Sequence, residues 1–491
     1  MQSKRDQVQA HLFLMNRLSS GLLLADPDNP ESPGGRTHRG LFFGLLGALV
    51  GCLVAALWGA VSPGTKTSWQ EEGTIVMEKD TGSRYLYVDG RLRPVQNYAS
   101  ARLLLGADPK TASVTSKSTQ GTPHGRPVGI PGAPDDLPGA DQLTGDPWQI
   151  CSDLRVQVSG QTSVRTRLAV GAAMAGKPLR DSEAVLVEAP DHTRHLVWHG
   201  TRLRLDQDSG AAESLGYGSV RARPVSEAFL DALPAGPDLA PPTVTGRGEP
   251  GPELAGRPTR VGQLFTLRPP GSALEYHLLL REGLVRLGAT GTALVLGDPR
   301  TRTDAYGGKA PEPRPLTGDE ARGHLATAAA PSGLPDTPPR ALDVPDGSDA
   351  CVQMKPGDGE SRAPSVAVVA GDLPPEDVAL PPTDHVAEAC LPADVIAVRP
   401  GEGALIRALS SAGTQMGDTT YLVTDTGVKY PLASEEVLED LGYTVAEERG
   451  LPSAVLAMLP TGPVLDPEAA AGAAAATVPD LCVNGGSTGT S

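Results

Sequence analysis

Residues 420–434 read TYLVTDTGVKYPLAS, in which two short apolar runs flank the turn-forming tripeptide Asp425-Thr426-Gly427. Short runs rich in β-branched and aromatic residues on either side of such a turn predict a β-hairpin. Its polar residues, together with Lys429, could form a chemical site. Alternatively, the hairpin belongs to a structural unit that the chain uses more than once. The rest of the sequence decides between these interpretations.

An earlier stretch of the chain repeats this pattern. From His195 the sequence reads HLVWHGTRLRLDQDSGAAESLGYGSVRARPVSEAFLDALPAGP, and from Tyr421 it reads YLVTDTGVKYPLASEEVLEDLGYTVAEERGLPSAVLAMLPTGP. Both contain Leu-Gly-Tyr, and both reach Leu-Pro-x-Gly-Pro 18 residues later, at 233–237 and 459–463. An equal offset between two such motifs indicates an internal repeat.

Two shorter stretches have the same form, YLYVDGRLRPVQNYASARLLLG at 85–106 and YHLLLREGLVRLGATGTALVLG at 276–297. A helix-compatible segment follows most clearly in the first, second and fourth copies. We therefore predict a unit of one hairpin and one or two short helices, present four times. Glycine suits the positive φ that such turns require, and the predicted turn glycines are Gly90, Gly200, Gly283 and Gly427.

Pro- and Gly-rich tracts at 107–147, 234–258 and 299–347 separate these units, and strand-like runs such as VRTRLAV and SVAVVA predict a further central domain. The predicted fold class is α+β. A single transmembrane helix precedes an elongated extracytoplasmic region of four small α+β repeats around a central β-rich core domain. The predicted division is a cytoplasmic amphipathic segment at 1–40, the transmembrane helix at 41–61, a first repeat at 70–110, an N-terminal segment of the core domain at 125–185, a second repeat at 186–245, a third repeat at 259–300, a C-terminal segment of the core domain at 345–400, a fourth repeat at 401–470 and a flexible tail at 471–491.

Charge is distributed unevenly along the 491 residues. The net charge is −16, and residues 1–40 carry five Lys or Arg against four Asp or Glu. The remainder therefore carries 37 basic and 54 acidic residues. This excess of acidic residues after residue 40 would repel the phosphate backbone of a nucleic acid, so we expect no binding of nucleic acid.

Residues 41–61, LFFGLLGALVGCLVAALWGAV, contain no charged residue. A helix of this length spans about 31 Å, which matches a hydrocarbon core of about 30 Å. A cleaved signal peptide is the competing interpretation, but the run is long for one and 40 residues precede it. Arg36 and Arg39 lie before the span, and Glu71-Glu72 follow Lys66. This asymmetry predicts a cytoplasmic N-terminus and a large region outside the membrane.

Four of the five cysteines, Cys151, Cys351, Cys390 and Cys482, follow the span, and Cys52 lies within it. An even number in a disulfide-permissive compartment favours structural disulfides, and four cysteines allow three pairings. None has a zinc-ligand spacing, so we expect no metal site.

Before the span, apolar residues recur at spacings of three and four and predict one face of a helix of about 20 residues. A lone helix of this length is marginal in water, so the face needs a partner. A protein groove is favoured over the bilayer surface, because only two basic residues flank the start of the helix. The predicted partner-helix face is Val8, Leu12, Met15, Leu18 and Leu22.

Several of these motifs, taken in order, resemble EccB, a membrane component of the actinobacterial type VII (ESX) secretion system. They are YLYVDGRLRPVQNYASARLLLG, RPVGIPGAPDDLPG, PWQICSD, the LDALPAGP and LAMLPTGP tails, VRPGEGALIRA and TYLVTDTGVKYPLASEEVLEDLGY, with the N-terminal segment and the span before them.

The resemblance implies a structural subunit that supports protein export across the cytoplasmic membrane. It implies assembly with the EccC motor ATPase, EccD and EccE, self-association, and four repeats similar to a phage-lysin cell-wall-binding fold, with cell-wall contact. The family disulfide between the first repeat and the core would map onto Cys151 and Cys351, which leaves Cys390 and Cys482 as a second pair. The alternatives are an extracytoplasmic nucleotide hydrolase and a peptidoglycan-binding membrane anchor.

Some family members carry an ATPase label, but phosphate binding by a Walker A motif needs G-x4-G-K-[ST] between a strand and a helix. Gly59–Thr67 has one residue too many, and Gly307-Gly308-Lys309 lacks the upstream glycine and the hydroxyl. His385 and Glu388 could lie on one helix turn, but a surface pair is the favoured interpretation. Asp206-Gln-Asp208-Ser-Gly210 lacks most calcium-loop ligands and predicts a turn. We therefore expect no catalytic, cofactor-binding or metal-binding residues and no cofactor.

Overall fold

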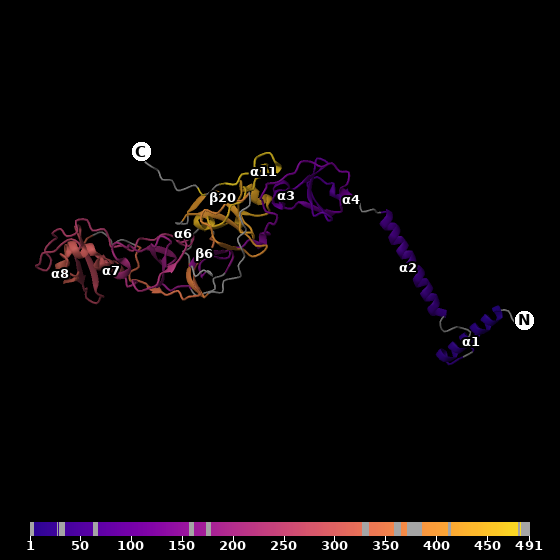
Figure 1. Cartoon of the computed structure of the whole chain (residues 1–491), viewed down its shortest axis with the longest axis horizontal. Helices are drawn as coiled ribbons and strands as arrows, with labels where there is room; N and C mark the ends of the chain where they lie inside the picture. Colours follow the sequence, from indigo (N-terminus) through magenta and orange to yellow (C-terminus); the bar gives the residue numbers. More distant parts are fainter. Residues whose placement is uncertain are drawn as a thin grey trace. The chain divides into compact units, whose positions relative to one another are not determined.

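The computed structural model describes residues 4–26, 28, 35–61, 67–156, 162–172, 178–326, 333–357, 365–370, 385–410, 414–479 and 482 (Figure 1). It divides into two compact units. The first comprises Met1–Glu71, Val76–Ser83 and Ala112–Thr122, and the second comprises Glu72–Ile75, Arg84–Thr111 and Pro123–Ser491. The mixture of helices and sheets confirms the predicted α+β class.

The first unit contains two long helices, α1 (Lys4–Leu24) and α2 (Gly35–Val61), which are followed by the short helix η1 (Thr67–Trp69). Its later segments are held together by hydrogen bonds. The N–H of Lys79 donates to the carbonyl of Val114 over 2.9 Å, and Asp80 accepts from both the N–H and the hydroxyl of Ser116. These two donors lower the pKa of the Asp80 carboxyl.

Four small sheets share one strand order. In each, three strands follow one another in sequence and a fourth lies beside the first, in the orders β3-β2-β1-β4, β9-β8-β7-β10, β13-β12-β11-β14 and β21-β20-β19-β22. The fourth strand runs parallel to the first in the last three sheets, whereas the hairpins are antiparallel. The strands are β1 (Thr74–Glu78), β2 (Arg84–Val88), β3 (Arg91–Pro94), β4 (Lys110–Val114), β7 (Glu183–Glu188), β8 (Arg194–Trp198), β9 (Thr201–Arg204), β10 (Arg223–Pro224), β11 (Leu264–Leu267), β12 (Glu275–Leu280), β13 (Gly283–Leu287), β14 (Arg314–Leu316), β19 (Ala404–Leu409), β20 (Gln415–Val423), β21 (Lys429–Pro431) and β22 (Arg449–Pro452).

Short helices accompany these sheets. Helix α7 (Ala289–Gly297) follows the hairpin of the third sheet. No clear helix was expected there, because its glycines and threonines are poor helix formers. Burial of Leu294 and Val295 overrides that propensity. The remaining helices are α3 (Tyr98–Leu105), α4 (Ser116–Thr119), η2 (Ala140–Gln142), α5 (Ala211–Ser214), α6 (Glu227–Asp231), η3 (Thr301–Ala305), α8 (Gly318–Ala321), α9 (Glu436–Asp440), η4 (Val445–Glu447), α10 (Ser453–Leu456) and α11 (Pro467–Ala471).

A closing segment pairs with the last hairpin strand of every sheet. One residue of that strand donates its N–H to a carbonyl of the segment and accepts from the N–H two residues further on. The four sets are Leu92 with Pro123 and Gly125, Arg202 with Pro234 and Gly236, Leu284 with His324 and Ala326, and Lys429 with Pro460 and Gly462. The Pro- and Gly-rich tracts, expected only to separate units, therefore supply strand partners. The predicted ends of the first and third repeats, at 110 and 300, exclude them.

The closing segment also explains the Leu-Pro-x-Gly-Pro motif. The first proline of the motif takes part only through its carbonyl, which accepts a hydrogen bond, so its missing N–H costs nothing. The glycine two residues later lies close to the strand. A Cβ at Gly462 would lie 2.3 Å from Cε1 of Tyr430, and a Cβ at Gly236 would lie 2.4 Å from Cδ2 of Leu203.

Replacing Gly462 with alanine is expected to lower the free energy of unfolding by about 1–3 kcal/mol, because the new methyl group overpacks the buried ring of Tyr430. Chemical denaturation measures this difference. Gly318→Ala is the control, since nothing lies within 4 Å of its added methyl group. Equal stability of the two variants would contradict the packing role of Gly462.

A fifth sheet joins distant segments of the chain. Its order is β17-β16-β5-β6-β18, formed by β5 (Trp148–Val156), β6 (Thr162–Ala169), β16 (Ser348–Met354), β17 (Ser365–Ala370) and β18 (Val395–Ala397). The chain leaves this sheet after β6, forms the second and third small sheets, and returns at β16. These five strands lie in the two stretches from which one core domain was predicted. Strand β15 (Arg340–Leu342), which precedes β16 in the chain, pairs with β7 and so adds a strand to the second small sheet.

One hydrophobic cluster links this core sheet to two of the small sheets. It includes Trp148 and Val352 of the core sheet, Phe229 of α6, and Val455 and Leu459 from α10 and the residues after it. A second cluster packs Leu103 of α3 against the fourth small sheet and its helices. The second unit is therefore held together by shared cores and not only by its connecting segments.

The repeated Leu-Gly-Tyr motif ends a helix and anchors a connecting segment. Gly216 and Gly442 have φ of 82° and 80°, which lets the chain turn sharply after α5 and α9. The buried hydroxyl of Tyr217 donates to the carbonyl of Pro339 over 2.7 Å, and that of Tyr443 donates to Pro138 over 2.8 Å. Burial raises the pKa of Tyr217 to about 12.

Candidate functional site

Helix α2 carries the apolar run predicted to cross the membrane. Thr37–Leu57 is long and apolar enough to span a bilayer, and none of it is buried inside the protein. Its leucines and phenylalanines are more than half exposed at most positions. Side chains of this kind are stable only in hydrocarbon or against another apolar surface.

Helix α1 carries the predicted partner face. Val8, Leu12, Met15, Leu18 and Leu22 all lie on this helix and are exposed, from 54% at Met15 to 81% at Leu22. Phe13 and Leu14 are exposed as well, so the apolar surface is wider than the predicted stripe. Nothing in the described structure covers this face, and its role as a partner surface stays a prediction.

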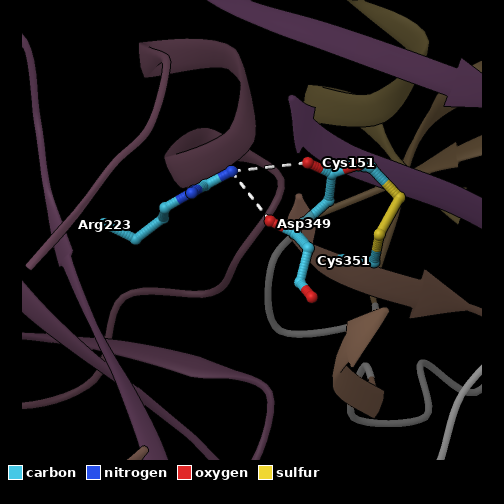
Figure 2. Close-up of a disulfide and its surroundings, with 5 residues drawn as sticks. Cys151, Arg223, Asp349 and Cys351 are labelled. Atoms are coloured by element: carbon cyan, nitrogen blue, oxygen red, sulfur yellow. Dashed lines mark hydrogen bonds and ion pairs between the residues drawn. A yellow bond between two sulfur atoms is a disulfide. The ribbon is translucent and has the colours of Figure 1, made fainter. Parts of the chain in front are cut away.

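The first disulfide joins Cys151 to Cys351 (Figure 2). The two residues are directly opposite in the register of β5 and β16, and both are buried. The bridge therefore lies within the core sheet. It does not connect a first repeat to the core, as the resemblance implied, because Cys151 lies in a core strand.

A buried ion pair lies two residues from this bridge along β16. Nη2 of Arg223 donates to the carbonyl of Ser348 over 2.8 Å and lies 3.4 Å from Oδ1 of Asp349, and both charged side chains are less than a tenth exposed. Figure 2 shows Arg223 extending from its own sheet toward the strand of Cys351. Burial lowers the pKa of the Arg223 guanidinium, and the negative charge of Asp349 raises it. The two charged side chains connect the second small sheet to the core sheet.

The second disulfide joins Cys390 to Cys482. Before Cys482, helix α11 ends at Ala471, and the N–H of Val464 donates to the carbonyl of Thr477. The flexibility of the tail at 471–491 stays a prediction. Residues 480–481 and 483–491 of that tail lie outside the described residues.

The four predicted turn glycines all have positive φ, of 69° at Gly90, 71° at Gly200, 126° at Gly283 and 75° at Gly427. In the first two sheets the residue before the glycine is also left-handed, as a two-residue hairpin turn requires. Asp425 accepts from the N–H of Gly401 over 2.8 Å, and the hydroxyl of Thr426 bonds that of Thr424. These polar groups hold the loop and do not converge on a ligand site.

Lys429 is buried in β21. Its Nζ donates to the carbonyls of Leu456 and Leu459 over 2.6 and 2.7 Å, at the end of α10. Burial lowers the pKa of Lys429 to about 8. Sequence reasoning identified the residue but not its burial, because a lysine in a strand is normally solvated.

Stability should depend on pH through this lysine. The unfolded chain keeps the proton up to the ordinary pKa of 10.5, so between pH 8 and 10.5 the unfolded state binds more protons and stability rises with pH. Relative to Lys429→Met, the wild-type free energy of unfolding is expected to rise by about 1–2 kcal/mol between pH 7 and 9. Parallel denaturation curves at both pH values measure this. A pH-independent difference would show that the folded pKa is ordinary.

One known family matches nearly the whole chain. Residues 1–479 match the model described as "Type VII secretion system ESX-1, transport TM domain B", the EccB family. The chain belongs to this family. Its EccB relatives include "ESX-3 secretion system ATPase EccB3" of Mycolicibacterium smegmatis, 28% identical with 94% of this chain and 89% of that protein covered. "ESX-5 secretion system ATPase EccB5" of Mycobacterium tuberculosis is also 28% identical, with 94% and 92% covered.

Solved structures agree with this EccB assignment. A chain of an intact ESX-5 inner membrane complex is similar with a TM-score of 0.63 and 25% identity, and the match covers 96% of this chain and 95% of that one. An EccB3 dimer from the ESX-3 core complex is similar with the same TM-score and identity, over 81% of this chain and 99% of that one.

Both EccB relatives are named as ATPases, and two glycine-rich stretches of this chain are candidates for nucleotide binding. Gly307-Gly308-Lys309 follows the helical turn η3 and precedes strand β14, which is the reverse of the strand-to-helix order that a P-loop needs. The N–H of Lys309 closes a local turn with Tyr306. For Gly59–Thr67, residues 62–66 lie outside the described residues of the chain.

The structure also shows where the weaker candidates for metal binding lie. His385 and Glu388 do not lie in a helix, so they do not share a helix turn, and both are exposed, in agreement with the favoured interpretation of surface residues. The Asp206–Gly210 stretch forms a turn, in which the N–H of Gly210 donates to Gln207 and that of Ala211 donates to Asp206. Within the described ranges, no group of three or more His, Cys, Asp or Glu side chains is placed to hold a metal ion.

Proposed function

We propose that this chain is a structural subunit of an ESX-type inner-membrane complex and supports protein export through it. The observation that carries the proposal is the match of 96% of the chain to a chain of an intact ESX-5 inner membrane complex. The single span-length helix among the described residues and the two disulfides fit a membrane-anchored scaffold.

The proposed topology places the N-terminus in the cytoplasm and the sheets outside it. Two arginines, Arg36 and Arg39, precede the apolar stretch of α2, and Glu71 and Glu72 lie beyond it. The two disulfides support the same orientation, since they persist in an oxidising compartment.

We further propose that the four small sheets are copies of one repeat, and that each repeat extends along the chain to include its closing segment. Their common strand order and the common hydrogen-bond pattern of the closing segments support this. Such units offer surfaces for the proposed partners, EccC, EccD and EccE, for another copy of this chain, and for cell-wall contact. Solved relatives occur in a membrane complex and as a dimer.

Deletion of the chain in its own organism tests this function. We expect loss of ESX export and loss of the full-size complex on native gels, both restored by the intact chain. Crosslinking in membranes followed by mass spectrometry then identifies the partners. A full-size, exporting complex without this chain would overturn the proposal.

The exposed face of α1 supplies a finer test. Leu12→Asp with Leu18→Asp is expected to reduce incorporation into the complex at least about tenfold, because charge on a buried apolar contact costs more than about 1.4 kcal/mol. Native gels with quantitative blotting measure the incorporated fraction. Gln9→Asp with Asn16→Asp adds the same charge to exposed polar positions of the same helix and should leave incorporation unchanged. Equal loss in both variants would exclude a specific apolar contact.

A further inference from the structure

A cleft of about 720 Å³ lies beside the core sheet and includes Cys390 of the second disulfide in its lining. Its walls come from β6, from the end of β7 and the β7–β8 turn, from residues 224–228 between β10 and the start of α6, and from residues 390–394. Prolines from three of these segments, Pro190, Pro224 and Pro392, contribute to an apolar lining. The volume falls within the range of about 300–1,000 Å³ that binding sites for small ligands occupy.

One wall of the cleft is the part of β6 that precedes its pairing with β18. Thr166 of β6 donates its N–H to Oδ2 of Asp394 over 2.7 Å, and its carbonyl accepts from the N–H of Asp394 over 2.9 Å. Backbone groups two residues apart on a strand face the same side. The N–H and carbonyl of Val164 therefore point to the same side, and among the described residues no strand pairs with them there, since β18 pairs only with Arg167–Ala169.

The polar groups of the cleft are mainly acidic. Among the described residues, its lining contains the carboxylates of Glu188, Glu227 and Asp394 and one imidazole, that of His192, and no lysine or arginine. Glu188 contacts His192 and Arg194, and Asp394 accepts from Thr166. Glu227 is exposed and has no partner within the described structure. Unbalanced negative charge in an apolar cleft favours a positively charged occupant.

We propose that this cleft binds an extended, basic segment of another polypeptide, which adds to the edge of β6 as a strand. Main-chain hydrogen bonds to Val164 supply the affinity common to strand addition, and Glu227 and Asp394 select lysine or arginine side chains. A flat strand edge beside prolines suits an extended chain better than a helix, because the helix backbone is already hydrogen-bonded internally.

The test uses the full chain in detergent and two fluorescein-labelled, end-capped peptides, Thr-Lys-Val-Lys-Val-Lys-Thr and Thr-Glu-Val-Glu-Val-Glu-Thr. Fluorescence anisotropy measures their binding, and hydrogen exchange measures protection of the backbone around Val164. We expect the lysine peptide to bind at least about tenfold more tightly than the glutamate peptide and to protect this backbone. Binding should weaken about two- to fivefold in Glu227→Gln, whereas Glu282→Gln, an exposed glutamate of the third sheet, should have no effect.

Val164→Pro removes only the outward N–H and should abolish strand addition, and Val164→Thr keeps that N–H and should bind normally. Equal binding of both peptides, or normal binding to a correctly folded Val164→Pro chain, would overturn the proposal. Two other occupants of the cleft would give different hydrogen-exchange results, and either result would also overturn the proposal. Protection of Val164 that is lost when the chain is cut after Cys482 would identify residues 483–491, and protection that rises with protein concentration alone would identify a second copy.

Discussion

Replacing Cys151 and Cys351 together with serine is expected to lower the free energy of unfolding of the core sheet by about 3–5 kcal/mol. The bridge closes a loop of 200 residues, and a cross-link over so long a loop removes much conformational entropy from the unfolded chain. The loss should concentrate in the core sheet, because the bridge joins two neighbouring strands of that sheet.

Fluorescence of Trp148, buried in the same sheet, reports this unfolding in denaturant. The Cys390→Ser and Cys482→Ser pair, which opens a loop of 92 residues, should cost less by about 0.7 kcal/mol, and Cys52→Ser in α2 should cost nothing measurable. Wild-type stability that is identical with and without reductant would show that the Cys151–Cys351 bridge does not contribute.

Arg223→Met is expected to destabilise the junction between the second small sheet and the core sheet by about 3–5 kcal/mol. The substitution removes the guanidinium that lies 3.4 Å from Oδ1 of the buried Asp349, and loss of this compensation for a desolvated carboxylate charge is the main cost. Asp349→Asn added to Arg223→Met should recover much of the loss, because it removes that charge.

The neighbouring Arg221 provides a matched control. It forms an ion pair with Asp346 at 3.4 Å in which both side chains are more than three-quarters exposed. Arg221→Met should therefore cost only about 0–1 kcal/mol. Denaturation of both variants, monitored through Trp148, measures the contrast. If Arg223→Met were no worse than Arg221→Met, the buried pair would not stabilise the junction.

Local sequence patterns predicted the local structure well. The uncharged run at 41–61 lies within α2, and Gly90, Gly200 and Gly427 have positive φ in the loops between hairpin strands, whereas Gly283 has positive φ as the first residue of β13 and not in the turn itself. The equal offset from Leu-Gly-Tyr to Leu-Pro-x-Gly-Pro pointed to a common structure, and the second and fourth small sheets share strand order and closing hydrogen bonds.

Features that depend on distant residues were predicted less well. Helix α7 was not clearly expected, since its sequence is a poor helix former and burial of Leu294 stabilises it. The closing segments were taken for linkers because proline and glycine predict loops, and pairing with a strand more than 30 residues away leaves no local period. The cleft beside β6 combines side chains from four separate segments, and no motif marks it.

The sequence by itself determined the apolar span, the glycine turns and the repeated motifs, because hydrophobic length, backbone φ and spacing are properties of neighbouring residues. Only the tertiary structure decided that Cys151 faces Cys351 in one sheet, that Arg223 meets Asp349, and that Lys429 is buried against the end of α10. These contacts follow from the register of strands and the packing of sheets far apart in the chain. The free energy that selects them is the sum over a whole core, which no single stretch of sequence contains.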